Sequence, residues 1–217
     1  QDNLLTLNTT AGMITASTLA LATTEVMGLT TLTNVTTNTD LDGDDDIIDF
    51  SRITNTSLNF NLDNKTFKNA ANEQFAFDGY ENIVGGSNTD YIFHSENDVS
   101  GSSYGLVGGQ GTDYILALNL DVIRYDLEEK YRTSSENVHG VQVNLSNLLN
   151  QPSKDTYGDD DYLIADNVYG TSLSDLITGN ENNNIIYGYG GNDTLSGLGG
   201  NDIIVGGLGS DFIDGGI

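Results

Sequence analysis

A nine-residue period in the C-terminal part of the chain constrains the fold more than any other feature. Five consecutive nonads begin at Gly170, Gly179, Gly188, Gly197 and Gly206. Each nonad starts with Gly, has an acid or amide at its sixth position and an aliphatic residue at its eighth. With the unit before them, the sixth positions are Asp166, Asp175, Asn184, Asp193, Asp202 and Asp211, and the eighth are Val168, Ile177, Ile186, Leu195, Ile204 and Ile213. A fixed period of this kind indicates a repeat architecture whose units stack on one another.

Each nonad divides into a turn and a short strand. Gly in the first six residues allows positive φ and lets backbone carbonyls point at one centre. The last three residues fit a short strand whose single aliphatic side chain points inward. Two nonads make one coil, so stacked equivalents come from every second nonad. One edge of the stack then carries Asp175, Asp193 and Asp211, and the other carries Asp166, Asn184 and Asp202.

The same unit recurs twice upstream as isolated copies. Gly85–Phe93 has Asp90 at its sixth position, and Gly108–Leu116 has Asp113 there. We therefore interpret the whole chain as one β-solenoid, irregular in its N-terminal part and regular at its C-terminus. The expected divisions are a Thr-rich β segment that starts or caps the solenoid (1–40), an irregular solenoid with loop excursions (41–157) and the regular roll (158–217). The excursions are expected at 94–107 and 117–157, with one weak helical stretch at about 118–136.

The charge of the chain is strongly negative and unevenly placed. The chain has 7 Lys and Arg against 32 Asp and Glu, which gives a net charge of −25. Residues 155–217 contain ten Asp, one Glu and no Lys or Arg. This balance argues against nucleic acid and acidic lipid as direct partners, since both need a basic patch. No run of about 18 apolar residues occurs, so no membrane span is expected.

The nonads resemble the pattern G-G-x-G-x-D-x-U-x of the RTX, or hemolysin-type calcium-binding, repeat family. The resemblance is continuous over about 161–217. It implies an all-β fold, a right-handed parallel β-roll, with several Ca²⁺ ions between successive coils on each edge. Each ion would take two sixth-position side chains from stacked turns, in the pairs Asp193/Asp211, Asp175/Asp193 and Asn184/Asp202. Backbone carbonyls would complete the sites, and the residues expected to supply them are Gly188, Gly190, Leu198, Gly200, Gly207 and Gly209. In the two isolated upstream units, the resemblance implies Asp90 and Asp113 as metal ligands.

Two nonads depart from the pattern. The turns beginning at Gly170 and Gly179 lack Gly at their second and fourth positions, and Asn184 offers a neutral ligand. We expect metal to bind there weakly or not at all, and expect the Asp193/Asp211 site to be the best formed. The alternative for all these Asp residues is that they form turns on a solvated ladder. Stacked carboxylates about 5 Å apart would, however, repel one another without a cation.

A second acidic run spans residues 38–49. It matches an EF-hand loop at several positions, but Asp45 stands where that loop requires an aliphatic residue, and no amphipathic helices flank it. We interpret Asp46 as the acidic residue of a degenerate solenoid turn and a further metal ligand. A solvated acidic turn without metal is the alternative.

No catalytic constellation stands out, and we expect no enzyme activity in this chain. Gly101–Gly105 satisfies G-x-S-x-G, but that motif requires a strand, a sharp turn and a helix, and no helical pattern follows it. The two His residues, His94 and His139, are far apart in sequence and match no metal or acid–base motif.

The residues and the resemblance together predict a calcium-dependent structural module of a large secreted or cell-surface bacterial protein. Self-repulsion would keep the chain expanded in a calcium-poor cytosol and during type I secretion. Ca²⁺ at about millimolar concentration outside the cell would then couple binding to folding. An adhesin or surface protein is the first choice for the parent, and the repeat module of a secreted hydrolase, protease or alginate epimerase, or of an RTX toxin, is the alternative. A carbohydrate on Tyr169, Tyr187 and Tyr189, or a host or cell surface, is an open alternative partner besides calcium.

Overall fold

The regular elements in the described parts of the protein are almost all β-strands. The computed structural model describes residues 4–8, 26–27, 47–52, 56–72, 74–76, 80–95, 103–131, 139–145 and 152–217. These parts of the chain contain eighteen strands and one helix. Their bounds are β1 (Leu4–Asn8), β2 (Val26–Met27), β3 (Ile47–Arg52), β4 (Leu58–Asn61), β5 (Thr66–Asn69), β6 (Gln74–Ala76), β7 (Asn82–Val84), β8 (Tyr91–His94), β9 (Gly105–Val107), β10 (Tyr114–Arg124), α1 (Tyr125–Tyr131), β11 (Gln142–Asn144), β12 (Ser153–Lys154), β13 (Asp160–Tyr169), β14 (Leu176–Thr178), β15 (Ile185–Tyr187), β16 (Thr194–Ser196), β17 (Ile203–Val205) and β18 (Phe212–Asp214).

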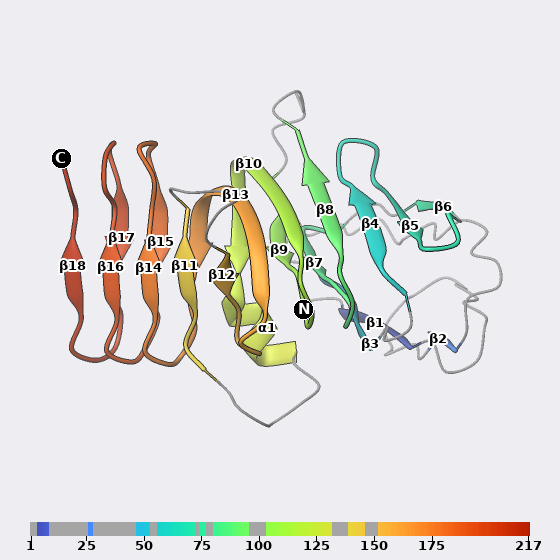
Figure 1. Cartoon of the computed structure of the whole chain (residues 1–217), viewed down its shortest axis with the longest axis horizontal. Helices are drawn as coiled ribbons and strands as arrows, with labels where there is room; N and C mark the ends of the chain where they lie inside the picture. The colour runs from blue at the N-terminus through green and yellow to red at the C-terminus, as the bar shows by residue number, and fades with distance from the viewer. Residues whose placement is uncertain are drawn as a thin grey trace.

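The strands form two long, mostly parallel ladders that are joined into one sheet. The first ladder runs from β1 through β3, β7 and β9 to the ends of β10 and β13, and on to β15 and β17. The second runs from β4 through β8 to the beginnings of β10 and β13. The antiparallel strand β12 connects β13 to β11, from which β14, β16 and β18 continue in parallel. Figure 1 shows the resulting stack of coils, with the C-terminal nonads forming the regular end.

The core follows from the register of the ladders. In the roll, Val168 pairs with Ile186, and Ile177 pairs with Leu195, so the eighth positions of the nonads are aligned. All four of these side chains are fully buried. The expected single inward aliphatic residue per strand is therefore confirmed for these nonads, and each strand contributes only one large side chain to a thin core.

The N-terminal half has a wider core with aromatic residues. Phe50, Phe60 and Phe67 pack edge-on or tilted against one another with ring centroids 4.8–5.6 Å apart. Phe67 comes from β5, which pairs antiparallel with both β4 and β6. This antiparallel meander widens the N-terminal coils and provides room for the rings.

The helix α1 covers the outer side of the first ladder. Its Leu127 completes a second buried cluster with Ile47, Val84 and Val107, one from each of β3, β7 and β9. These residues leave the outer side of the ladder apolar, and the helix buries them. No helix in the described ranges is long and apolar enough to cross a membrane.

The observed elements confirm the expected all-β, parallel solenoid and correct some of its details. Residues 118–124 continue β10 instead of beginning a helix, because Val122, Ile123 and Arg124 pair in parallel with β13. Within the described residues the helix spans Tyr125–Tyr131. Strand β9 lies inside the expected excursion 94–107, but it pairs with β7 and β10 and so belongs to the stack. Of residues 1–40 only β1 and β2 are described, and the expected domain boundaries stay predictions.

Candidate metal centre

The Asp residues at the sixth positions form a ladder of hydrogen bonds that joins neighbouring coils. Asp193 Oδ1 accepts the backbone N–H of Asp175 at 2.9 Å, and Asp211 Oδ1 accepts that of Asp193 at 3.0 Å. On the other edge, Asp202 Oδ1 accepts the N–H of Asn184 at 2.9 Å. The same bond recurs upstream at 2.7–3.0 Å. Asp90 accepts the backbone N–H of Leu58, Asp113 that of Asp90, Asp161 that of Asp113, and Asp175 that of Val141. One carboxylate oxygen of each Asp is thus used to hold the coil before it.

The second oxygen of several of these carboxylates has no hydrogen-bond donor. Asp193 Oδ2 and Asp202 Oδ2 are buried and accept no hydrogen bond, and the same is true of Asp113 Oδ2 and Asp161 Oδ2. A buried charged oxygen left without a partner is costly, so native proteins supply one. A cation is the missing partner that the family resemblance predicts at Asp113, Asp193 and Asp202.

The surroundings of the unpartnered oxygens fit calcium. A Cβ added at Gly188 would collide with Asp193 Oδ2 and would lie 2.6 Å from the carbonyl oxygen of Gly206. Gly197 has the same relation to Asp202 Oδ2, with the carbonyl oxygen of Gly215 at 3.0 Å from the added Cβ. In both turns a carboxylate oxygen and a carbonyl oxygen of the following coil lie close to the Gly, and the turn that begins at Gly179 has the same geometry with the amide oxygen of Asn184 in place of the carboxylate. Carboxylate and carbonyl oxygens are the ligands that Ca²⁺ prefers.

Side chains alone do not form a metal site in the described parts of the chain. In the described ranges, no three His, Cys, Asp or Glu side chains are arranged so that they could hold an ion. An ion in the roll would therefore depend on backbone carbonyls, as the predicted ligands Gly188, Gly190, Leu198, Gly200, Gly207 and Gly209 require. All six lie in the stacked turns of the last three nonads, and their assignment as ligands stays a prediction.

Burial, with repulsion from neighbouring carboxylates in some cases, raises the pKa values of four of the stacked carboxyl groups. Burial, with a smaller contribution from the charge of Asp211, raises the pKa of Asp193. Burial raises the pKa of Asp175 to about 6, although hydrogen bonds from Thr171 and Val141 oppose the change. Upstream, burial raises the pKa of Asp90 to about 7, and burial plus the charge of Asp90 raises that of Asp113 to about 9. A bound cation would favour the ionised form and reverse these shifts.

Sequence reasoning missed a group of buried acids beside Asp113. Burial raises the pKa of Asp155 to about 8, with Glu128 as the strongest charged neighbour, and raises the pKa of Asp161 well above its usual value. Burial and the same carboxylates also raise the pKa of the Tyr125 phenol. The repeat of Gly43–Ile48 in Gly158–Leu163, which aligns Asp46 with Asp161, was the signal that could have identified Asp161. Glu128 comes from α1, and no sequence pattern connected it to the turns.

The remaining predicted ligands have different surroundings. Asp166 and Asn184 lie in neighbouring coils, but amide side chains connect them: Asn184 Nδ2 donates to the backbone oxygen of Asp166 at 2.8 Å. Asp90 accepts hydrogen bonds at both of its oxygens, from Leu58 and Gly86. Asp46 lies outside the described residues, so its role stays a prediction.

The residues considered for catalysis have structural contacts in the described parts of the chain. Ser103 is exposed, its hydroxyl donates to the carbonyl oxygen of Leu120 at 2.7 Å, and a strand follows it where the motif requires a helix. His94 is fully buried, with Nδ1 at 2.6 Å from Asp121 Oδ2. That carboxylate also accepts the N–H of Tyr104, so the pair ties β8 to β10 and to the start of β9.

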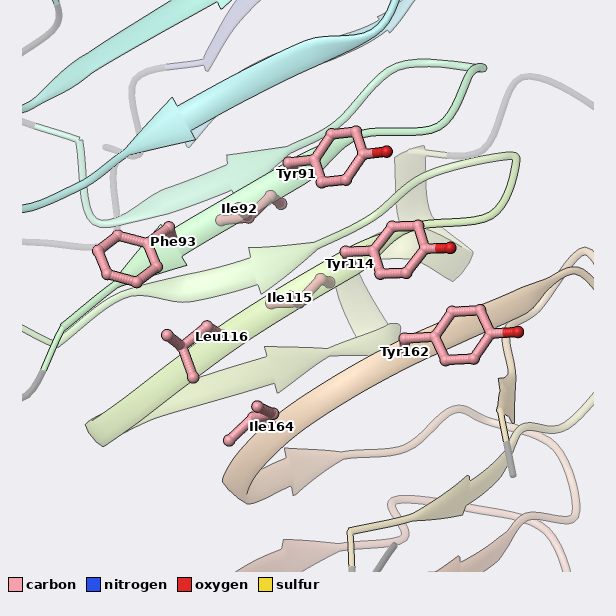
Figure 2. A pocket seen from close by; sticks show the side chains of 8 residues that line it. All are labelled: Tyr91, Ile92, Phe93, Tyr114, Ile115, Leu116, Tyr162 and Ile164. Atoms are coloured by element: carbon pink, nitrogen blue, oxygen red, sulfur yellow. The ribbon is translucent and has the colours of Figure 1, made fainter. Parts of the chain in front are cut away.

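An aromatic surface lies on the outer side of the second ladder. Tyr91, Tyr114 and Tyr162 occupy paired positions on β8, β10 and β13, with near-parallel rings 4.9–5.1 Å apart. Figure 2 shows the three rings in one file with their hydroxyls pointing the same way, next to Phe93, Leu116 and Ile164. The tyrosine file and the row formed by Phe93, Leu116 and Ile164 border a shallow apolar groove of about 220 Å³. The tyrosines singled out from the sequence lie elsewhere, where Tyr169, Tyr187 and Tyr189 pack against one another and Arg124 stacks on Tyr169.

Comparison with known proteins identifies the repeat. The family model described as the RTX calcium-binding nonapeptide repeat (4 copies) matches residues 169–204 and 187–217. No curated protein matches the chain significantly. The matched residues are the stacked turns and strands in which Asp193 and Asp202 have unpartnered oxygens. The C-terminal part of this chain is therefore a block of RTX calcium-binding repeats, and the chain carries a calcium-binding structural module of the RTX type.

Proposed function

We propose that this module folds on extracellular Ca²⁺ as part of a secreted or cell-surface protein of the adhesin type. The observation that carries the proposal is the buried, unpartnered second oxygen of Asp193 and Asp202 at the centre of the repeat block. Without a cation, these oxygens oppose stacking of the coils. A cation bound between two neighbouring turns is held by oxygens of both turns, so calcium binding and stacking of the coils become one event.

The charge distribution supports the coupling to secretion. Residues 155–217 contain no Lys or Arg that could neutralise their eleven acids. In a calcium-poor cytosol the self-repulsion of this segment favours an expanded chain, which suits passage through a secretion channel. Extracellular Ca²⁺ at about millimolar concentration is sufficient to fill sites with dissociation constants of about 10⁻⁴–10⁻³ M, which are typical of extracellular calcium-binding modules.

The aromatic surface supports the adhesin type. In the file of tyrosines, Tyr91 and Tyr114 are exposed and Tyr162 is half-buried. No charged side chain lies among the groove-lining residues, which suits an uncharged sugar. The alternative is a repeat module attached to a secreted enzyme or a toxin, with the activity elsewhere in the parent protein. Binding of the chain to neutral glycans that is lost in Tyr114→Ala would favour the adhesin; a hydrolytic activity in the parent that survives Tyr114→Ala would favour the enzyme.

A far-UV circular dichroism titration tests the folding switch. Chelator-stripped protein is titrated with Ca²⁺, and Mg²⁺ serves as the control because it demands a tighter octahedral shell. A cooperative gain of β signal that Ca²⁺ produces and Mg²⁺ does not is the expected result. A spectrum that is already fully β without metal and does not change on addition of Ca²⁺ would contradict the proposal.

A further inference from the structure

The seven nonapeptide turns adopt two different backbone conformations. In the turns that begin at Gly188, Gly197 and Gly206, the second and fourth positions both have positive φ: 65° and 112°, 74° and 107°, and 103° and 129°. The upstream turn that begins at Gly108 has the same pair, at 90° and 120°. None of the residues in the turns that begin at Gly85, Gly170 and Gly179 has positive φ.

The fourth residue decides which conformation a turn takes. Gly occupies that position in all four turns of the first kind, as Gly111, Gly191, Gly200 and Gly209. Their φ of 107–129° is a region that L residues rarely adopt, whereas Tyr189 and Leu198 tolerate the φ of 65° and 74° at the second position. A Cβ at Gly200 would also lie 2.5 Å from the carbonyl oxygen of Asn182 in the preceding coil. Asn88, Leu173 and Asn182 stand at the fourth position of the other three turns and exclude this conformation.

The two conformations treat the sixth-position side chain differently. Asp113, Asp193 and Asp202, which follow turns of the first kind, each have a buried Oδ2 without a donor. Turns of the second kind saturate this side chain with protein donors. Asp175 accepts from the N–H of Thr171 at Oδ2 and from the Thr171 hydroxyl at Oδ1, at 2.7 and 2.9 Å, besides the N–H of Val141. Asp90 accepts from Gly86 and Leu58.

Amide side chains close the turn that begins at Gly179. Asn184 Oδ1 accepts the N–H of Asn180 at 2.9 Å, and Asn184 Nδ2 donates to the backbone oxygen of Asp166. The carboxylate of Asp166 accepts from Nδ2 of both Asn180 and Asn182, at 2.9 Å each. The donors of three amides thus point at the oxygens that a cation would otherwise hold between these two coils. Because N–H groups and a metal ion cannot occupy the same position, this turn does not fit calcium.

We propose that the turns beginning at Gly108, Gly188, Gly197 and Gly206 are calcium turns, and that those beginning at Gly85, Gly170 and Gly179 are closed by the protein's own side chains. The inference rests on the proposed calcium-dependent folding and specifies which turns need calcium in order to stack. Metal is required from Gly188 onward, while residues 170–187 form a coil that stacks without it. That coil presents a ready-made surface on which the calcium-dependent coils assemble. Within this assignment Asp90, Asp166, Asp175 and Asn184 serve as hydrogen-bonding residues, and Asp175 does not act as the metal ligand expected from its position.

Counting bound calcium in the full chain tests the assignment. Equilibrium dialysis, with native mass spectrometry as a second readout, compares Asp193→Asn with its matched counterpart Asn184→Ala. We expect Asp193→Asn to bind at least one ion fewer than the unmodified chain and Asn184→Ala to bind the same number. The double variant Asn182→Gly with Asn184→Asp supplies the missing Gly and carboxylate, and we expect it to bind one ion more.

The outcomes separate this inference from the proposed function. Loss of an ion in Asn184→Ala, or no gain in the folded double variant, would overturn the division into two kinds of turn. An unmodified chain that binds no calcium would instead defeat the proposed function. If Asn184→Ala does not fold, Thr171→Val replaces it as the test, at the turn that begins at Gly170. An unchanged number of bound ions in Thr171→Val supports the inference, and the loss of an ion contradicts it.

Discussion

The two halves of this solenoid are held together in different ways. In the C-terminal roll, each coil consists of two nonads, and each of β14, β15 and β16 adds one buried aliphatic side chain to the core. In the N-terminal half, the stacked equivalents Ile48, Ile83 and Leu106 are unevenly spaced along the sequence, and aromatic rings fill a wider interior. The roll therefore buries little apolar surface per coil and depends on what joins its turns, whereas the N-terminal half depends on its core.

Removal of calcium should have the largest effect and should separate the two halves. On chelation, we expect residues 188–217 to lose protection from amide hydrogen exchange, because their turns lose the shared cation. Strands β3, β4, β7 and β8 should stay protected, because Phe50, Phe60 and their neighbours stay buried. Hydrogen exchange followed by mass spectrometry measures both regions in one sample. Equal loss of protection in the two halves would show that they unfold as one unit.

Phe60→Ala should weaken the N-terminal half even at saturating calcium. Removing a fully buried ring from the aromatic cluster costs about 3–5 kcal/mol of unfolding free energy. Denaturant unfolding at saturating Ca²⁺ measures this loss, and Asn59→Ala, an exposed neighbour on the same strand, is the control. A Phe60→Ala variant as stable as the control would mean that the core contributes little and that the comparison between the halves is wrong.

Rising pH should destabilise the calcium-free protein. The pKa of Asp155 is about 8 and that of Asp113 about 9 in the folded state, against about 4 in an unfolded chain. Between these values the folded state keeps a proton that the unfolded state has lost, so the stabilisation is complete below about pH 4 and is lost as pH rises toward 8–9. The expected slope is about 1.4 kcal/mol per pH unit for each such group.

Denaturant unfolding in chelator between pH 5 and 8 measures this slope. Asp155→Asn should reduce it, because the amide oxygen can still accept the N–H groups of Tyr157 and Asp159 but does not titrate. A stability that rises with pH in this window would contradict the assignment of protonated buried carboxyl groups.

Thr171→Val should have the smallest effect, and the effect should not depend on calcium. The substitution removes the hydroxyl that donates to Asp175 Oδ1 and keeps the shape of the side chain. The hydroxyl also accepts the N–H of Leu173, so the expected loss is about 2 kcal/mol, at about 1 kcal/mol for each of the two hydrogen bonds. Unfolding free energies measured with Ca²⁺ and with chelator should fall by the same amount. A loss seen only with Ca²⁺ would place a metal ion at this turn and remove the distinction between the turns.

The regular half was more predictable from the sequence than the irregular half. A period of nine assigns the places of Asp193 and Leu195 without knowledge of any distant residue, because each nonad contacts its equivalents two nonads away. The positions of Phe67, Glu128 and Asp155 depend on an antiparallel meander, a helix and a hairpin that interrupt the stack. No local pattern indicates which coil such insertions approach, so the buried acids beside Asp113 were missed.

The sequence by itself determined the parallel stack, the inward aliphatic positions and the acidic edges, because these follow from a short period and from strand geometry. It also contained the Gly at the fourth position of each calcium turn, although the importance of that Gly became visible only with the backbone angles. Only the tertiary structure decided which oxygens have no donor. Whether Asp193 Oδ2 lacks a partner while the carboxylate of Asp175 is saturated depends on Thr171, Val141 and the neighbouring coils together. Hydrogen-bond saturation is a property of the assembled turn, and a sequence pattern records only the residues that can take part in it.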